Sequence, residues 1–234
     1  MRYVFLSYNY SPEFKTPESW VERTAMYTGI LEELAKWNTV INVKQIGYQG
    51  EYLHNGVQHH FVKLNTAKTR FPTKFNRYIK GLKPDVVVYP GVHQPLELMQ
   101  LALLLGPKVK LMVHNHAEKP FGGLKKYAQR AAGYFADAYL FASGPMGMEW
   151  VERGNLKGAG KIHEVMEVSS VFKPIDRHLA LSKTHVSGQP VFLWVGRLND
   201  NKDPLTVVKA FLQFAEIHPS ARLYMIYHTD ELLA

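Results

Sequence analysis

The sequence contains no cysteine, which excludes disulfide bonds and thiolate metal ligands. This absence permits a reducing compartment without proving one. It also lacks a long apolar run, because its most apolar segment, Leu96–Leu105, falls well short of the about 20 residues that a membrane span needs. The N-terminus turns polar after a few strand-like residues, so we expect no signal peptide. We therefore predict a cytoplasmic location.

An Asp-X-Asp motif of the kind that holds a divalent cation is missing. The stretch Asp200–Asp203 does not supply one, because Lys202 within it would oppose the cation. His114 and His116 have the spacing of a strand chelate, but no cysteine or clearly placed carboxylate completes the set. We predict no metal site and no cofactor.

Acidic residues are absent from 52–84, in a chain whose formal net charge is +8. The apolar side chains of 71–82 fall on one helical face and basic ones on another, and we expect Pro72 near the helix start. Such a helix either lies on an anionic membrane or packs on a sheet with a solvated basic face. The basic residues of the stretch are Lys63, Lys68, Arg70, Lys74, Arg77, Lys80 and Lys83.

The chain of 234 residues has 46% hydrophobic and 21% charged residues, which is a globular composition. Its apolar segments alternate between strand-like and helix-like patterns, which indicates an α/β fold with a doubly wound parallel sheet. We predict a Rossmann-like domain over 1–170, a linker over 171–190 and the start of a second domain over 191–234. The expected strands are Arg2–Tyr8, Thr39–Ile46, Val57–Leu64, Asp85–Pro90, Val109–Val113, Ala138–Ala142, His163–Val168, 191–195 and 221–227.

Helices are expected between these strands. The first would run from Trp20 to Trp37, with Ser19 as its N-cap. The others expected are 71–82, Leu96–Leu105, Leu124–Phe135, Pro145–Arg153 and 203–217. His59 and His60 sit next to each other in a strand pattern, and we interpret both as structural.

The most informative stretch is 191–210. An apolar strand ends at Gly196, a loop carries Arg197 and Lys202, and Asp203-Pro204 opens an amphipathic helix. Parallel sheets bind ligands at the carboxyl ends of their strands. A guanidinium fork and an ammonium beside a helix N-terminus suit a diphosphate, and glycine permits close approach. The alternative is an ordinary strand–turn–helix with solvated charges.

This stretch resembles the start of the second domain of the retaining glycosyltransferases of family 4, which have the GT-B fold. The resemblance rests on Val195-Gly196-Arg197-Leu198, Lys202-Asp203-Pro204-Leu205, Ala210-Phe211 and 219–223. It implies that Arg197 and Lys202 bind the diphosphate of a nucleotide-sugar donor, which the backbone at Gly196 would approach closely. Neutralisation of the diphosphate by Arg197 and Lys202 would make a metal unnecessary, so we predict a metal-independent enzyme. Because a domain with only two strands cannot bury both faces of its sheet, we expect that the chain is truncated within its second domain, or that a partner completes it. Relatives carry a pair of glutamates eight positions apart in the missing part, so we expect this chain to be inactive by itself.

The resemblance extends over the first domain. His114, at a strand end, looks like the active-site histidine of many family members. The segment 163–174 looks like the exit from the first domain, with Ser169-Ser170 where relatives carry Asn-Gly. Many relatives have a Gly-Gly pair in the first loop, where this chain has 11–19. Lys15 and Thr16 would replace it as donor contacts, and a plain surface loop is the alternative.

Polar and small residues after His114 are candidates for holding the acceptor. They are His116, Glu118, Lys119, Gly122 and Gly123. The alternative is a turn that leads into the helix at 124.

The function predicted from these features is retaining transfer of a sugar, of hexosyltransferase type, from a nucleotide-diphosphate sugar to a glycan or lipid-linked acceptor in polysaccharide biosynthesis. The basic first domain would touch the inner face of an anionic membrane. An epimerase or phosphorylase of the same architecture is one alternative, and an epimerase would use Glu118 and Glu167 as acid and base. A non-catalytic membrane- or nucleic-acid-binding module is another, although motifs for nucleic acid are not apparent.

Overall fold

The computed structural model describes residues 1–64 and 72–227. The chain divides into two compact units, Met1–Phe172 and Lys173–Ala234. Among the described residues, no helix is both long and apolar enough to cross a membrane. The predicted basic residues Lys68 and Arg70, and also Phe71, lie outside the described residues.

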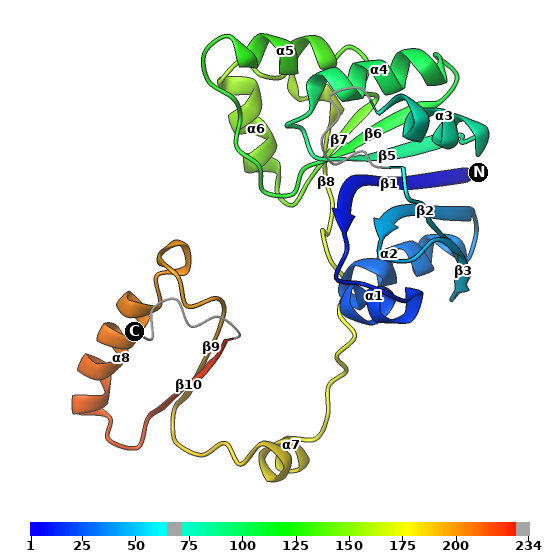
Figure 1. The fold of residues 1–234 in the computed structure, drawn as a ribbon. Coiled ribbons are helices and arrows are strands. Elements are labelled where there is room, and N and C mark those ends of the chain that lie inside the picture. The colour runs from blue at the N-terminus through cyan, green and yellow to red at the C-terminus, as the bar shows by residue number, and fades with distance from the viewer. Residues whose placement is uncertain (65–71, 228–234) are drawn as a thin grey trace. The chain divides into compact units, whose positions relative to one another are not determined.

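The first unit is built on one sheet of eight strands, in the order β3-β4-β2-β1-β5-β6-β7-β8 (Figure 1). All neighbouring pairs are parallel except β3 and β4. The strands are β1 (Arg2–Ser11), β2 (Thr39–Ile46), β3 (Gly50–His54), β4 (Val57–Phe61), β5 (Val86–Pro90), β6 (Lys110–His114), β7 (Ala138–Phe141) and β8 (Ile162–Glu164).

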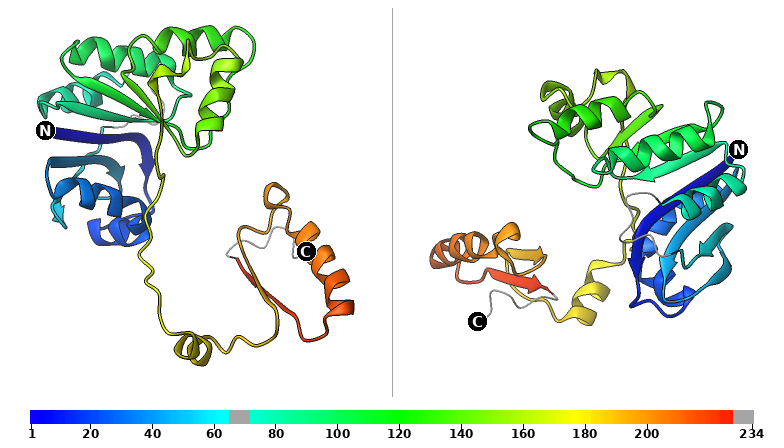
Figure 2. Two further views of the ribbon diagram at one scale, coloured as in Figure 1. Left: turned by 180° about the vertical axis from the view of Figure 1, so that it is seen from behind. Right: turned by 45° about the horizontal axis from the view of Figure 1, so that its top comes forward.

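Helices cover both faces of this sheet, as the view from behind also shows (Figure 2). Leu31 of α2 packs against Phe5 and Val88 on one face. Trp150 belongs to the larger cluster on the other face, together with side chains of three further helices. The helices are α1 (Pro17–Arg23), α2 (Ala25–Ala35), α3 (Thr73–Gly81), α4 (Pro95–Leu105), α5 (Lys125–Ala132) and α6 (Gly144–Glu152).

The expected single helix over Trp20–Trp37 is wrong, and so is Ser19 as its N-cap. Thr16 is the N-cap, its Oγ1 accepting from the backbone N–H of Ser19 at 3.3 Å. The helix breaks at Thr24, whose Oγ1 donates to the carbonyl of Trp20 at 2.7 Å. A threonine that bonds back to residue i−4 competes with the helical ladder and bends the chain.

Strand β3 was not expected from the sequence. It pairs antiparallel with β4 through a two-residue turn in which Asn55 and Gly56 have φ of 46° and 83°. Asn-Gly with positive φ at both positions is the favoured hairpin turn. The predicted strand His163–Val168 is also shorter than expected, since β8 ends at Glu164.

The second unit contains α7 (Arg177–Thr184), β9 (Val191–Val195), η2 (Asp200–Lys202), α8 (Pro204–Ile217) and β10 (Arg222–Ile226). β9 and β10 pair in parallel, and Phe192 packs edge-on against Phe214 of α8 at 5.3 Å between ring centroids. The predicted linker 171–190 therefore includes a helix, which Asp176 caps through its Oδ1 and the N–H groups of His178 and Leu179. Leu193 and Val195 are 62% and 66% exposed. A unit with only two strands has too few elements to bury both faces of its sheet.

Candidate functional site

A cavity of about 320 Å³ lies in the first unit where the central strands end. Ser7 and Asn9 of β1, Lys44 of β2, Pro90 of β5 and His114 of β6 line it. Carboxyl ends of neighbouring parallel strands meet at one sheet edge, the usual ligand-binding edge in doubly wound folds. The other lining residues are Leu6, Ser11, Trp20, Thr24, Tyr27, Gln45, Val88 and His116.

His114 ends β6 and is buried. Burial, together with the neighbouring His116, lowers the pKa of His114 to about 4, although Glu167 acts in the opposite direction. Its Nε2 is shielded from solvent and has no hydrogen-bond partner among the described residues. At neutral pH, His114 is therefore a neutral imidazole that lines the cavity and whose buried Nε2 has no hydrogen-bond partner among the described residues.

His116 is held from two sides by carboxylates. Its Nδ1 lies 3.0 Å from Oε1 of Glu167, and its backbone N–H donates to Oε2 of Glu118 at 2.7 Å. Glu118 also lies over Gly91, where φ is 79° and where a Cβ would collide with its Oε1. These contacts fix the orientation of His116 at the rim of the cavity.

The loop after His114 is organised by the buried Asn115. Its Oδ1 accepts from the N–H of Ala117 at 3.0 Å, and Ala117 takes a positive φ of 64°. The carbonyl of Lys119 lies 2.8 Å from Nε2 of His93. The structure thus brings His114, His116 and Glu118 together, while Lys119 contributes its backbone to the packing of the loop.

The remaining first-unit candidates do not line this cavity. Lys15 is exposed and Thr16 is engaged as the α1 cap. Gly122 and Gly123 are exposed, and a Cβ at either would meet no atom within 4 Å among the described residues. Their roles in donor or acceptor binding stay predictions.

Arg197 and Lys202 belong to the second unit, in the loop between β9 and α8. Both are exposed, and within residues 72–227 neither forms an ion pair with a carboxylate at 4.0 Å or less. The N–H of Lys202 donates to the carbonyl of Asn199 at 3.0 Å, which fixes the turn of η2. Asp203 then caps α8 by accepting from the N–H of Thr206 at 3.3 Å.

Packing favours glycine at position 196, in addition to the predicted close approach of the backbone to the diphosphate. A Cβ there would lie 2.8 Å from Cζ2 of Trp194, so the indole ring needs a glycine. The N–H of Gly196 donates to the carbonyl of Ile226 at 3.1 Å, closing the end of the β9–β10 pair.

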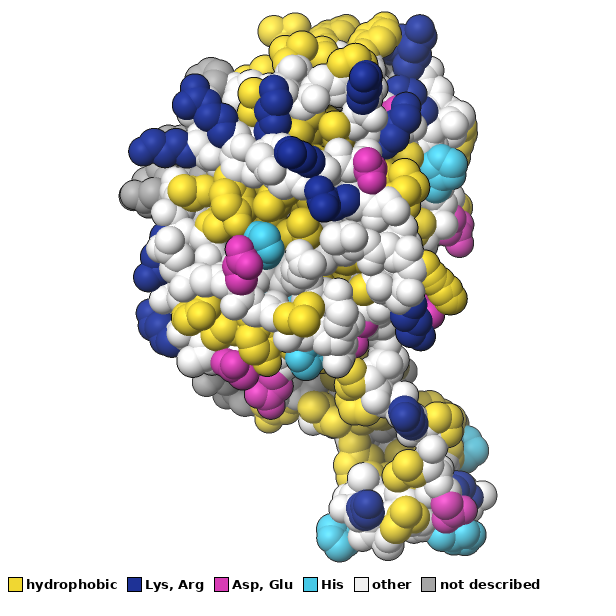
Figure 3. Space-filling model, turned by 90° about the vertical axis from the view of Figure 1, so that its right-hand side faces the viewer, with side chains coloured by type: hydrophobic (Ala, Val, Ile, Leu, Met, Phe, Trp, Pro, Cys, Tyr) yellow, Lys and Arg dark blue, Asp and Glu magenta, His cyan; other side chains and the backbone are white. Residues whose placement is uncertain are grey.

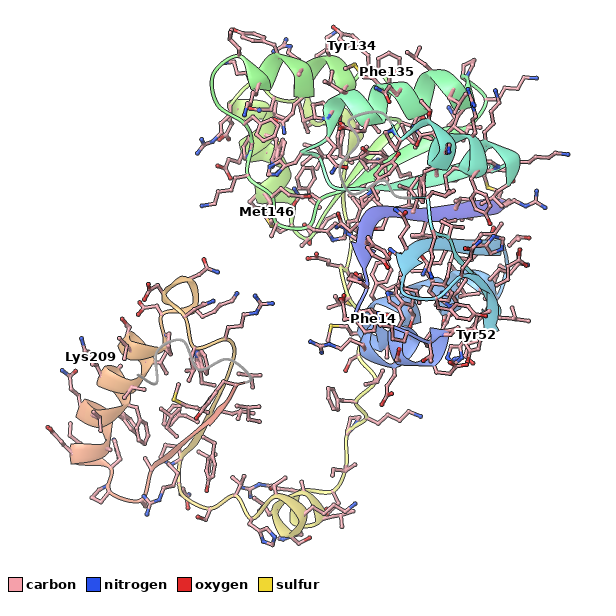
Figure 4. The ribbon with its side chains drawn as sticks, viewed as in Figure 1. Phe14, Tyr52, Tyr134, Phe135, Met146 and Lys209 are labelled. Atoms are coloured by element: carbon pink, nitrogen blue, oxygen red, sulfur yellow. The ribbon has the colours of Figure 1, made fainter. Side chains whose placement is uncertain are left out.

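Sequence reasoning missed Lys44, Trp20 and Tyr27. Lys44 is half-buried, and its Nζ lies 5.9 Å and 5.2 Å from the ring centroids of Trp20 and Tyr27. Trp20 itself sits in an aromatic cluster to which Phe14 and Tyr52, labelled in Figure 4, contribute. The signal that was available is a lysine among the buried residues of the strand Thr39–Ile46.

Metal ligands do not gather in the part of the chain that is described. Within 1–64 and 72–227, no three histidine, aspartate or glutamate side chains are placed to share an ion. Metal independence stays a prediction.

Comparison with known proteins supports the fold and leaves the family open. No protein-family model matches the chain, and no curated protein matches it. A solved structure named trehalose-6-phosphate from E. coli bound with UDP-2-fluoro glucose aligns with a TM-score of 0.60 and 14% identity, over 100% of this chain and 66% of that one. The OtsA apo structure aligns with a TM-score of 0.57 and 12% identity, over 97% of this chain and 65% of that one.

The chain has a GT-B-like fold. The predicted class, a GT-B-like α/β architecture with a Rossmann-like parallel sheet, is confirmed. Identities this low establish the fold alone. The chain spans about two thirds of the length of both solved structures.

Proposed function

We propose that this chain is part of a retaining glycosyltransferase, with a nucleotide-diphosphate sugar as donor and a glycan or lipid-linked molecule as acceptor. The observation that carries the proposal is the loop after β9, where Arg197 and Lys202 are exposed at a strand's carboxyl end on a GT-B fold. A guanidinium and an ammonium that form no ion pair with a described carboxylate suit a diphosphate. The E. coli structure, named as bound with UDP-2-fluoro glucose, supports a nucleotide sugar as donor.

In the proposed reaction, the bond between the anomeric carbon and the diphosphate oxygen breaks. The acceptor oxygen bonds to the same carbon on the same face, and its proton is left on the diphosphate. Arg197 and Lys202 stabilise the negative charge that grows on the leaving diphosphate, which is the largest electrostatic demand of the step. No metal is required in this scheme.

His114 is proposed to orient the reacting sugar. A buried imidazole nitrogen without a partner is costly, and a bound hydroxyl would satisfy it. Because its pKa is lowered to about 4, His114 stays neutral at physiological pH and offers one donor and one acceptor. This supports a role in hydrogen bonding rather than in charge neutralisation.

We also propose peripheral contact with an anionic membrane. Lys74, Arg77 and Lys80 of α3 are exposed, and Lys and Arg side chains gather in the upper part of the face seen in Figure 3. Phe75 and Ile79 of the same helix are fully buried against the sheet. The contact would therefore be electrostatic, without insertion of the apolar side of α3.

A second candidate is a nucleotide-sugar epimerase. It is favoured by one observation, the two carboxylates of Glu118 and Glu167 on either side of His116. An epimerase needs acid and base groups of this kind at the sugar, whereas the basic loop after β9 would bind the diphosphate in either enzyme.

One experiment tests both candidates. The full-length protein is incubated with a panel of nucleotide-diphosphate sugars, with and without glycan and lipid-linked acceptors, and products are followed by NMR. A product with the donor's anomeric configuration supports retaining transfer, and acceptor-independent inversion at another carbon supports the epimerase. If no donor is consumed, the transferase proposal fails. Residues 1–234 alone are expected to be inactive in the same assay.

A further inference from the structure

Lys44 lines the cavity and has no role in the proposed reaction. It lies near the end of β2, where Trp20 of α1 and Tyr27 of α2 cover the sheet. The cavity lining contains this one lysine and no carboxylate among the residues that the structure describes. A cation therefore faces a ligand-sized space without an opposing charge.

The surroundings of Lys44 compensate its charge only in part. Its contacts in the described structure are with the faces of two aromatic rings, at 5.2 Å and 5.9 Å from the ring centroids. Such cation–π contacts are weaker than a hydrogen-bonded ion pair. Burial lowers the pKa of Lys44 to about 8, so the ammonium remains the major form at neutral pH.

Two carboxylates at this end of the sheet have hydrogen-bond partners among the described residues. Glu167 lies 3.0 Å from Nδ1 of His116, and Glu118 accepts from the N–H of the same residue. His114 is neutral because its pKa is lowered to about 4 by burial and by His116. Lys44 therefore supplies the positive charge of the lining, whereas Glu118 and Glu167 lie outside it.

Two neutral features add to the preference for an anion. The hydroxyls of Ser7 and Ser11 line the same space and can donate hydrogen bonds. The first turn of α2 begins beside Thr24 and Tyr27 and carries no acidic residue and no side-chain cap. The N–H groups of Tyr27 and Thr28 donate to the carbonyl of Thr24, so the contribution of this turn is the positive end of the helix dipole.

We propose that Lys44 forms an oxyanion subsite in this cavity and holds a phosphate or carboxylate group of the acceptor. The assignment of this ligand as the acceptor rests on the proposed function, whereas the oxyanion subsite rests on the cavity and its one cation. Trp20 and Tyr27 shape the walls, and the ammonium supplies the charge. The acceptor class is thus an anionic sugar or sugar phosphate, free or lipid-linked.

The test uses the 234-residue protein without any donor. Its indole and amide NMR signals are followed during titration with inorganic phosphate and, separately, with acetate, at constant ionic strength. We expect a saturable shift of the Trp20 indole signal. Lys44→Met, which keeps the apolar stem and removes the charge, should weaken the binding at least about tenfold. Lys44→Arg keeps the charge and should retain binding. This variant distinguishes the loss of charge from a general disturbance of the fold at this position.

Lys108→Met is the matched control, because Lys108 is exposed and does not line the cavity. It should bind the anion as the unmodified protein does. Saturation by phosphate alone assigns a phosphate-bearing ligand, and saturation by acetate assigns a carboxylate. Failure of both anions to saturate, or equal binding by well-folded Lys44→Met, overturns the subsite. Because no donor is present, a protein that transfers no sugar leaves this result untouched, so the two proposals fail separately.

Discussion

The imidazole rings of His114 and His116 lie 4.4 Å apart between centroids, at the end of β6. The inner ring is buried and the outer one is exposed, so the two have different environments within two residues. Protonating His114 would place a charge in a desolvated position next to His116. This relationship makes His114 a source of pH-dependent stability.

We expect the free energy of unfolding to fall between about pH 6.5 and pH 4. The folded-state pKa of His114 is lowered to about 4, so the unfolded chain binds the proton more readily. The stabilisation is complete above the unfolded pKa and is lost as pH falls through this window, by up to roughly 3 kcal/mol. The measurement is urea-induced unfolding at several pH values, comparing the unmodified protein with His114→Gln.

His114→Gln should show a shallower decline, although not a flat one, because burial also lowers the pKa of His59 to about 4. His163→Gln, at an exposed position of β8, is the control and should leave the decline unchanged. An identical pH dependence in His114→Gln and the unmodified protein would refute the role assigned to His114.

A second prediction concerns the packing of α6. In Gly147→Ala, the new Cβ would lie 2.6 Å from Cγ2 of Ile162 and 3.0 Å from a ring carbon of Phe141. Overpacking of this kind costs about 1–3 kcal/mol, which exceeds the gain of roughly 1 kcal/mol from alanine in a helix. Thermal unfolding should therefore show net destabilisation.

Gly81→Ala provides the matched control for that change. Gly81 is the last residue of α3, and its Cβ would meet nothing within 4 Å among the described residues. Only the propensity gain applies, so stability should rise by up to about 1 kcal/mol. Equal effects of the two substitutions would argue against the tight contact between α6 and β8.

Much of the fold was predictable because several strands, such as β5 and β9, are strongly apolar. Strands β2 and β9 match the expected bounds Thr39–Ile46 and 191–195. Buried parallel strands are continuous apolar runs, and the turn residues after them are easy to recognise. The boundaries of β8 and the break at Thr24 were not predictable in the same way, because a side-chain bond and tertiary packing decide them.

The candidate site was predictable only in part. His114 and His116 were found because they follow an apolar strand directly. Lys44 was missed because its significance depends on Trp20 and Tyr27, which the break between α1 and α2 places over the sheet. Helix α7 was missed because its residues are mostly polar and exposed, so the Asp176 cap was the main signal.

A third prediction concerns membrane contact. The double change Lys74→Glu with Arg77→Glu should reduce binding to vesicles that contain anionic lipid, because both side chains are exposed on α3. The binding should also weaken steeply as salt is added, since exposed charges are screened within about 10 Å at 0.1 M. Vesicle co-sedimentation at several salt concentrations measures both effects.

The control reverses the same number of charges in the other unit. Lys183→Glu with Lys209→Glu alters exposed residues of α7 and α8, and Lys209 is labelled in Figure 4. If the two double variants bind the vesicles equally well, or if binding does not change with the salt concentration, the proposed contact between α3 and the membrane is wrong.

The last prediction returns to the loop between β9 and α8. In the full-length protein, Arg197→Ala and Lys202→Ala should each lower the transfer rate by about 10²–10³, the usual cost of removing one preorganised donor, roughly 3–4 kcal/mol. Stability should change by less than about 1 kcal/mol, because both side chains are exposed and form no described ion pair. Arg197→Lys should also be impaired, since an ammonium does not reproduce the planar fork.

Lys209→Ala removes an exposed charge from α8 and should keep the normal rate. Transfer rate and thermal unfolding are measured for each variant, with and without nucleoside diphosphate. Near-normal rates in well-folded Arg197→Ala and Lys202→Ala would remove the diphosphate role, and with it the main argument for glycosyl transfer.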